Sequence, residues 1–185
     1  MSLILASASP RRRELLSLIT ADFTVSPAKG EEAADKTLPP HLLVQELAKQ
    51  KAAEVADAHQ SDTVIGADTL VFLGTEIMGK PTDATDAKRM LTMLSGNTHT
   101  VITAVAIAQN GAVAKVFAEE TKVEFFSLTD DEITAYIATG EPMDKAGAYG
   151  IQDKGALLVK GITGDYYNVM GLPVSRLYRE IKPLL

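Results

Sequence analysis

The sequence predicts an α/β protein with a mixed β-sheet flanked by helices. Short β-branched and apolar runs alternate with amphipathic helical patterns along the 185 residues. Two long strand-like runs, 98–109 and 112–126, are separated by Asn110-Gly111, a strong signal for an antiparallel hairpin. The sequence contains no linker, internal repeat or low-complexity tract, so we expect a single domain over residues 1–185.

The first strand is expected over residues 2–6 and runs directly into a helix start. Ser9 suits the N-cap position and Pro10 the first helical position. Arg11 and Arg12 then lie in the first turn, where the partial positive charge of the helix disfavours cations. A strand, a serine-bearing turn and an arginine-bearing helix start are typical of phosphate binding, although a solvated basic turn is the alternative.

A long helix is predicted over residues 38–58, with an apolar stripe that includes Leu47 and Val55. Lys51 falls on this stripe, whereas Lys49 falls on the polar side. A lysine on a buried face either extends its amine to water or projects into a cleft toward an anion. The spacing leaves both alternatives open.

The central strand is expected over residues 63–72 and carries one carboxylate, Asp68, directly after Gly66-Ala67. A carboxylate within an apolar run loses hydration, so it requires a partner or a coordinated ion. Asp68 is therefore either a functional group or a structural aspartate that is hydrogen-bonded to a neighbouring loop. The residues of this strand do not decide between the two.

The remaining elements follow the same alternation. In chain order they are a strand over 22–26, a loop over 27–37, a short strand over 76–78, helices over 82–94, 129–138 and 173–181, an irregular glycine-spaced segment over 144–152, and a strand over 157–162. Residues 74–80 match the pattern of a P-loop, but Pro81 replaces its metal-binding hydroxyl and disfavours the required helix. We therefore reject a P-loop and retain Lys80 as a rigidly placed cation.

Composition narrows the classes of function. The chain is 46% hydrophobic and 23% charged, contains no cysteine, and has three scattered histidines. Any metal should therefore be a hard divalent cation, Mg²⁺ or Mn²⁺, held by carboxylates. The net charge of −6 argues against a nucleic-acid partner. We find no signal-peptide pattern and no apolar run of about 18 residues, so we expect a cytoplasmic protein without a membrane partner.

Five ordered motifs together resemble the Maf family of nucleotide pyrophosphatases. They are Ser7-Ala8-Ser9-Pro10-Arg11-Arg12, Gly66-Ala67-Asp68-Thr69, Gly79-Lys80-Pro81, Ser95-Gly96-Asn97-Thr98-His99, and the segment from Asp144 to Gln152. The resemblance extends from the first strand to Gly171-Leu172-Pro173 and so covers essentially the whole chain.

The resemblance implies an elongated mixed sheet with two lobes around a cleft, and often a homodimer. It also implies hydrolysis of a nucleoside triphosphate to a monophosphate and pyrophosphate. The chain is most similar to the branch that acts on dTTP and UTP, through Arg12, Thr69 and Gln152. Members of the family are also associated with inhibition of septum formation.

The charged residues agree with this activity and suggest roles. A triphosphate requires a cradle of cations and hydroxyl groups, for which the candidates are Ser7, Ser9, Arg11, Arg12, Lys51 and Lys80. Asp68 and Glu32 are the candidate metal ligands, and Asp68 is also the candidate general base. The alternative function is a nucleotide-binding regulator of cell division that does not turn its ligand over.

Overall fold

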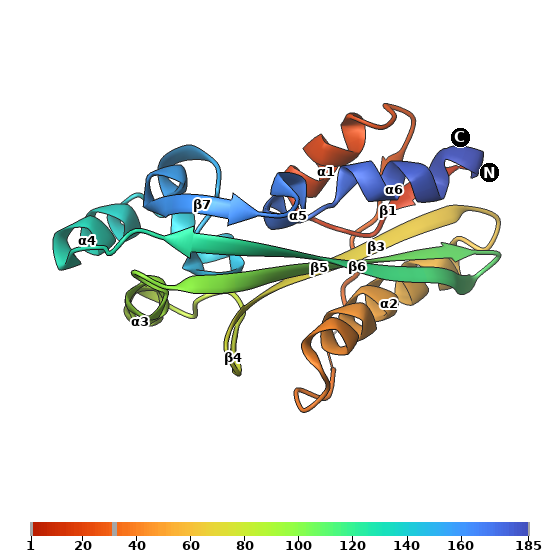
Figure 1. Ribbon diagram of the computed structural model, residues 1–185. Helices are drawn as coiled ribbons and strands as arrows, with labels where there is room; N and C mark the ends of the chain where they lie inside the picture. Colours follow the sequence, from red (N-terminus) through yellow and green to blue (C-terminus); the bar gives the residue numbers. More distant parts are fainter. Residues whose placement is uncertain (1, 31–32, 185) are drawn as a thin grey trace. The chain divides into compact units, whose positions relative to one another are not determined.

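The computed structural model describes residues 2–30 and 33–184 (Figure 1). The strands are β1 (Leu3–Leu5), β2 (Thr24–Val25), β3 (Thr63–Leu73), β4 (Glu76–Met78), β5 (Thr98–Gln109), β6 (Ala112–Phe125) and β7 (Val159–Thr163). The α-helices are α1 (Pro10–Ser17), α2 (Pro40–Ala58), α3 (Ala84–Leu94), α4 (Asp130–Ala138), α5 (Tyr166–Met170) and α6 (Val174–Ile181). The 3₁₀ helices are η1 (Glu141–Asp144), η2 (Ala146–Ala148), η3 (Asp153–Leu158) and η4 (Lys182–Leu184).

The seven described strands form one mixed sheet. Its order is β2-β1-β3-β5-β6-β7, and β4 pairs with β3 outside this path. β1 is parallel to both β2 and β3, whereas the β3–β4 and β6–β7 pairs are antiparallel. Asn110 and Gly111 both adopt positive φ, 53° and 75°, as a two-residue hairpin turn between β5 and β6 requires. The predicted mixed α/β fold is confirmed.

The chain forms two compact units. The first unit comprises Met1–Thr69, Thr103–Glu119 and Gly171–Leu185, and the second comprises Leu70–Ile102 and Glu120–Met170. β3, β5 and β6 each contribute residues to both units. The single domain over residues 1–185 stays a prediction.

In the first unit, helices cover both faces of the strands. α2 lies on one face, and α1 and α6 lie on the other (Figure 1). The backbone of α2 approaches β3 closely at Gly66, because a Cβ atom there would lie 2.6 Å from Ala52 N and 2.7 Å from Ala48 O. The absence of a side chain at Gly66 therefore sets the distance between α2 and β3.

In the second unit, the short helix η2 packs against the end of β3. Gly147 in η2 has φ of 71°, and its N–H donates to the Gly79 carbonyl at 3.0 Å. A Cβ atom at Gly147 would lie 3.0 Å from a methyl group of Val71. Glycine thus satisfies both the left-handed backbone and the close packing at this position.

The predicted helix starts agree with the structure. Ser9 caps α1 and Pro10 is its first residue, while Thr129 and Glu132 form a capping box at the start of α4. No helix begins at Pro81, which agrees with the rejection of a P-loop, since α3 begins at Ala84. Lys51 is half-buried on α2, as its place on the apolar stripe predicts.

Three elements differ from the expectations. β2 is shorter than the predicted 22–26, and β7 begins at Val159 because residues 153–158 form η3 instead. α5 was not predicted, because five residues do not complete the two turns over which helical periodicity becomes visible.

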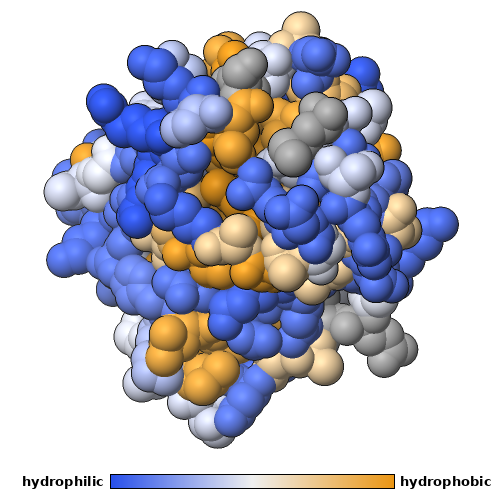
Figure 2. All heavy atoms as spheres, turned by 90° about the vertical axis from the view of Figure 1, so that its right-hand side faces the viewer, coloured by the Kyte–Doolittle hydropathy of each residue, from blue (hydrophilic) through white to orange (hydrophobic). Residues whose placement is uncertain are grey.

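The surface is predominantly polar in the view of Figure 2, with apolar atoms gathered near its centre. None of the described helices has the length and apolar composition that a transmembrane helix requires.

Candidate active site

Parallel pairing of β1 and β3 brings two of the sequence motifs together. Leu5 pairs with Ile65, and the Ala6 N–H donates to the Ile65 carbonyl at 2.8 Å. The carboxyl ends of parallel strands meet at one edge of a sheet. The Ser7–Ser9 turn therefore follows β1 at the level where β3 carries Ala67 and Asp68.

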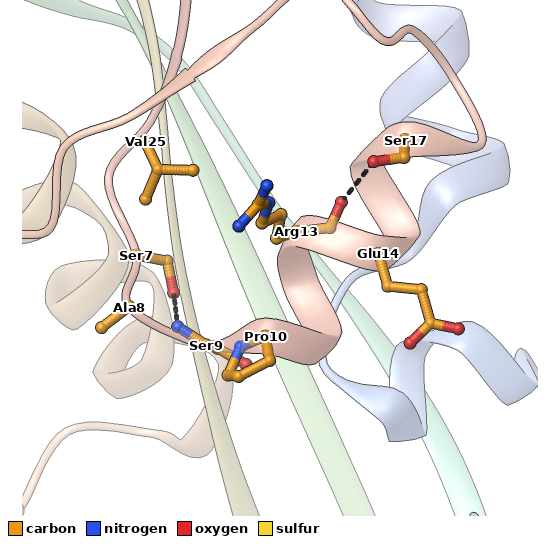
Figure 3. A pocket seen from close by; sticks show the side chains of 8 residues that line it. All are labelled: Ser7, Ala8, Ser9, Pro10, Arg13, Glu14, Ser17 and Val25. Atoms are coloured by element: carbon orange, nitrogen blue, oxygen red, sulfur yellow. Dashed lines mark hydrogen bonds between the residues drawn. The ribbon is translucent and has the colours of Figure 1, made fainter.

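The Ser7–Ser9 turn and α1 border a pocket of about 320 Å³ (Figure 3). Its lining residues are Ser7, Ala8, Ser9, Pro10, Arg13, Glu14, Ser17 and Val25. The Ser7 hydroxyl accepts from the Ser9 N–H at 3.2 Å, and the Ser9 hydroxyl accepts from the Arg12 N–H at 3.4 Å. The arginine that lines this pocket is Arg13, whose side chain extends from α1 into the space between the helix and Val25.

Asp68 is buried on β3, with 6% of its surface exposed, and pairs with Lys51. Lys51 Nζ lies 2.5 Å from Asp68 Oδ1. The close approach of α2 at Gly66 places Lys51 above this carboxylate. Lys49, by contrast, pairs with Glu46 at 2.8 Å, and both of these side chains are 41% exposed. Of the two lysines, the helix thus directs only Lys51 to Asp68.

The Arg12 guanidinium donates four hydrogen bonds within the first unit. Its Nε bonds to the Gly171 carbonyl at 2.8 Å, and its Nη1 bonds to the Ala67 carbonyl at 2.8 Å and to the Ser7 hydroxyl at 3.4 Å. Its Nη2 bonds to the Thr69 hydroxyl at 3.0 Å. Arg12 therefore ties α1 to β3 and to the segment that precedes α6.

Thr69 connects this arginine to a further buried residue. Its hydroxyl oxygen lies 2.9 Å from that of Thr103 on β5, which has no exposed surface. Successive side chains of a strand point to opposite faces. Asp68 therefore points toward α2 and Lys51, whereas Thr69 points toward Arg12.

Two predicted site residues belong to the second unit. Lys80 follows β4, and Gln152 directly precedes η3 with an extended backbone. Glu32 lies outside the described residues. Arg11 is partly exposed on α1. Within the first unit the structure thus brings together Ser7, Ser9, Arg12, Lys51, Asp68 and Thr69.

A second polar cluster, which the sequence did not predict, surrounds His99 in the second unit. His99 Nε2 lies 2.8 Å from the Tyr149 hydroxyl, and the rings of His99, Phe125 and Tyr149 make three edge-to-face contacts. His99 Nδ1 has no hydrogen-bond partner among the described residues. Burial lowers the pKa of His99 from 6.5 to about 4, so its ring is neutral at pH 7.

The same burial acts on the two tyrosines of this unit. Burial raises the pKa of Tyr149 well above its usual value of 10, and raises that of Tyr136 to about 12. The Tyr136 hydroxyl accepts from the Gly150 N–H at 3.1 Å. The segment that leads to Gln152 is therefore anchored by two neutral hydroxyl groups.

A divalent cation requires oxygen ligands, and few carboxylates lie close to one another among the described residues. Among them, no group of three or more His, Asp or Glu side chains lies close enough together to hold an ion. Magnesium is commonly held by one or two carboxylates together with substrate phosphates and water. Asp68 suits that mode of binding, since it is a buried carboxylate beside the Ser7–Ser9 turn.

Sequence patterns did not indicate Thr103, His99 or Gly171 as parts of these clusters. Thr103 and Gly171 reach the arginine through contacts that span 34 or more positions of the chain. One signal was available for His99, because it ends a motif whose other residues make tight local contacts. The Ser95 hydroxyl accepts from the Leu128 N–H at 2.7 Å, and Gly96 adopts φ of 68°.

Comparison with known proteins identifies the family. The family model described as Maf-like protein matches residues 2–184. The chain belongs to the Maf-like family. Its Maf-like relatives include a protein of Geobacillus sp. (strain WCH70), 54% identical over 183 residues and covering 98% of this chain and 97% of that protein. A protein of Bacillus cytotoxicus is 51% identical over 179 residues, with 97% and 93% covered. Both relatives are named dTTP/UTP pyrophosphatase.

Solved structures resemble this Maf-like chain in fold. The Staphylococcus aureus Ham1 protein superimposes with a TM-score of 0.59 at 14% identity, with all of both chains covered. A HAM1 protein from Coxiella burnetii gives a TM-score of 0.56 at 13% identity, with 98% of each chain covered. At these identities the similarity concerns the fold alone.

Proposed function

We propose that this chain is a nucleoside triphosphate pyrophosphatase that hydrolyses dTTP and UTP to the monophosphate and pyrophosphate. The observation that carries the proposal is similarity over nearly the whole length of both chains to relatives that bear this name, at 51% and 54% identity. The pair of buried Asp68 and half-buried Lys51 beside the Ser7–Ser9 turn supports it, because it combines a base and a cation with hydroxyl groups.

Asp68 is the proposed general base. In-line attack at the α-phosphorus requires a water molecule that loses a proton as the bond to phosphorus forms. The Asp68 carboxylate accepts this proton, and the bond between the α-phosphorus and the bridging oxygen breaks to release pyrophosphate. Lys51, within hydrogen-bonding distance of Asp68, pairs with the carboxylate and offers positive charge beside the reacting phosphate.

The remaining cradle residues neutralise the phosphate oxygens. Ser7 and Ser9 offer hydroxyl groups, Arg11 and Arg12 lie in the first turn of α1, and Lys80 is a further proposed cation. Arg12, Thr69 and Gln152 are the proposed specificity residues.

A divalent cation, Mg²⁺ or Mn²⁺, completes the proposal. Asp68 would hold it, with Glu32 as the second proposed ligand, and it would supply charge that lowers the cost of negative charge on the phosphate oxygens. A cytoplasmic location and a homodimer stay predictions.

The test is a panel of canonical and modified triphosphates, each scored for pyrophosphate and orthophosphate under multiple turnover with Mg²⁺ or Mn²⁺. We expect pyrophosphate release from UTP and dTTP. Binding without turnover would favour the alternative of a nucleotide-binding regulator, and orthophosphate release would indicate a phosphomonoesterase.

A further inference from the structure

No sequence motif discussed above includes Thr103, yet it lies in the hydrogen-bond network behind the proposed base. It is fully buried on β5, and its hydroxyl oxygen lies 2.9 Å from that of Thr69. We propose that Thr103 is a positioning residue for Asp68, acting through Thr69 and Arg12. The inference rests on the proposed function, in which Asp68 is the general base.

Arg12 holds β3 on both sides of Asp68. Its Nη1 donates to the Ala67 carbonyl at 2.8 Å, and its Nη2 donates to the Thr69 hydroxyl at 3.0 Å. The Ala67 carbonyl belongs to the peptide group that includes the Asp68 nitrogen. The two hydrogen bonds therefore restrain the backbone immediately before and immediately after the base.

Thr103 fixes the second of these restraints. The Thr69 hydroxyl accepts from Arg12 and is a rotor that would otherwise be free to turn about its Cβ–Oγ1 bond. The hydrogen bond to Thr103 gives it a second partner on a neighbouring buried strand. Side chains in such connected networks restrict one another, so loss of one hydroxyl loosens the others.

The network acts on Asp68 through the backbone. Thr69 and Thr103 lie toward Arg12, whereas the Asp68 carboxylate points to Lys51 on α2, on the other face of β3. Loss of the Thr103 hydroxyl therefore leaves the Lys51–Asp68 pair in place but relaxes the direction of the carboxylate. A small error in the position of a catalytic group lowers the rate of the chemical step more than it weakens substrate binding.

The experiment compares Thr103→Val, which replaces the hydroxyl by a methyl group, with Thr103→Ser, which retains it. We expect Thr103→Val to lower kcat for UTP about tenfold, with the Kd of a non-hydrolysable α,β-imido UTP within about twofold of wild type. Thr103→Ser should stay within about threefold of wild type in kcat. Thr63→Val is the matched control, because Thr63 is also buried and lies on β3, and its hydroxyl accepts from the Gln109 amide at 3.5 Å and is no part of the hydrogen bonds that join Thr103, Thr69 and Arg12.

Double mutants test the route by which Thr103 acts. In a Thr69→Val background, Thr103→Val should lower kcat by less than about twofold, because the connecting hydroxyl is already absent. In an Asp68→Asn background it should likewise leave the residual rate unchanged, because the base that it positions is gone. A tenfold loss that persists in either background would overturn the inference.

Three further results bear on the proposal. Equal kcat for wild type and Thr103→Val would overturn it, as would a loss that Thr103→Ser shares or that appears in the Thr63→Val control. If Thr103→Val does not fold, Thr103→Cys, which lacks the γ-methyl group and replaces the hydroxyl by a thiol that is a weaker hydrogen-bond partner, should lower kcat by several-fold relative to Thr103→Ser. Wild-type protein that releases no pyrophosphate from UTP or dTTP would instead overturn the proposed function itself.

Discussion

The two units keep buried polar side chains in opposite ways. In the first unit, Asp68 forms an ion pair with Lys51, whose Nζ lies 2.5 Å away. In the second, His99 is more deeply buried, with 1% of its surface exposed, and is surrounded by the rings of Phe125 and Tyr149. An ionised group inside a protein requires a counter-charge, whereas a neutral one requires only hydrogen-bond partners. The proposed active site thus contains an ion pair, whereas the cluster that anchors the loop before Gln152 contains a neutral histidine.

The two regions should respond differently to mutation. Removal of a charge from the Asp68–Lys51 pair should change the rate of hydrolysis more than the stability of the fold. Addition of a charge beside His99 should change stability more than the rate, because no described cation or carboxylate forms an ion pair with His99.

The largest effect is expected for Asp68→Asn. The substitution keeps the shape and removes the charge that accepts the proton, so we expect kcat to fall by roughly 10²–10⁴. The measurement is pyrophosphate release from UTP, with thermal unfolding of the same variant as the control for folding. A loss below about tenfold would exclude Asp68 as the general base.

Acidification should destabilise the protein through His99. Its pKa is about 4 in the folded state and 6.5 in the unfolded state, so the unfolded state takes up the proton first as the pH falls. The stabilisation is therefore complete above pH 6.5 and is lost progressively between pH 6.5 and 4. This group alone should lower the free energy of unfolding by about 2–3 kcal/mol between pH 7.5 and 4.5.

The control for this prediction is His99→Gln, whose amide does not titrate and still offers a hydrogen bond to Tyr149. Urea unfolding at both pH values gives the loss for each protein, and the carboxylates contribute equally to both. The difference between the two losses isolates His99. Equal losses would show that the ring is not held neutral by burial.

Sequence reasoning succeeded where local chemistry decides the structure. Pro10 after a capping serine starts α1, Asn110-Gly111 turns the hairpin, and the periodicity of α2 directs Lys51 inward. These outcomes depend on residues within one or two turns of each other, so the pattern itself contains the information.

The same reasoning was insufficient where partners are distant in the chain. Arg12 bonds to a carbonyl 159 positions away, and His99 bonds to a tyrosine 50 positions away. Periodicity carries no information about which buried strands become neighbours. The inference of a phosphate cradle from the first turn of α1 named Arg11 and Arg12, whereas the arginine that lines the adjacent pocket is Arg13.

A smaller effect on rate is expected for Lys51→Ala. Loss of the amine removes a cation beside Asp68 and should weaken transition-state binding by about 1–3 kcal/mol. Lys49→Ala is the matched control on the same helix, because Lys49 pairs with Glu46 on the exposed surface. Measurement of kcat/KM for UTP decides the matter, and equal effects at the two lysines would contradict the role assigned to Lys51.

The smallest effect is expected at Gln152, and it concerns selection of the base. Uracil and thymine present an N–H donor beside two carbonyl acceptors, whereas cytosine presents an acceptor beside an amino donor. A glutamine amide carries one acceptor and two donors in one plane, so it can pair with the first edge bidentately. It can also rotate to suit cytosine, so selection requires a loop that holds it.

The neutral cluster of the second unit supplies such a loop. Tyr149 is held by His99, and the Gly150 N–H donates to the Tyr136 hydroxyl, only two residues before Gln152. We therefore expect Gln152→Ala to lower the ratio of kcat/KM for UTP to that for CTP by about tenfold, because about 1–2 kcal/mol of hydrogen bonding to the preferred edge is lost. The value of kcat for UTP should change by less than about threefold. Tyr149→Phe, which deletes only the hydroxyl bonded to His99, should lower the same ratio by a smaller factor. Gln60→Ala, at an exposed glutamine in the turn after α2 in the first unit, should not change it. An unchanged ratio in Gln152→Ala would assign Gln152 to the structure of the loop alone and would remove the functional reason for the neutral cluster.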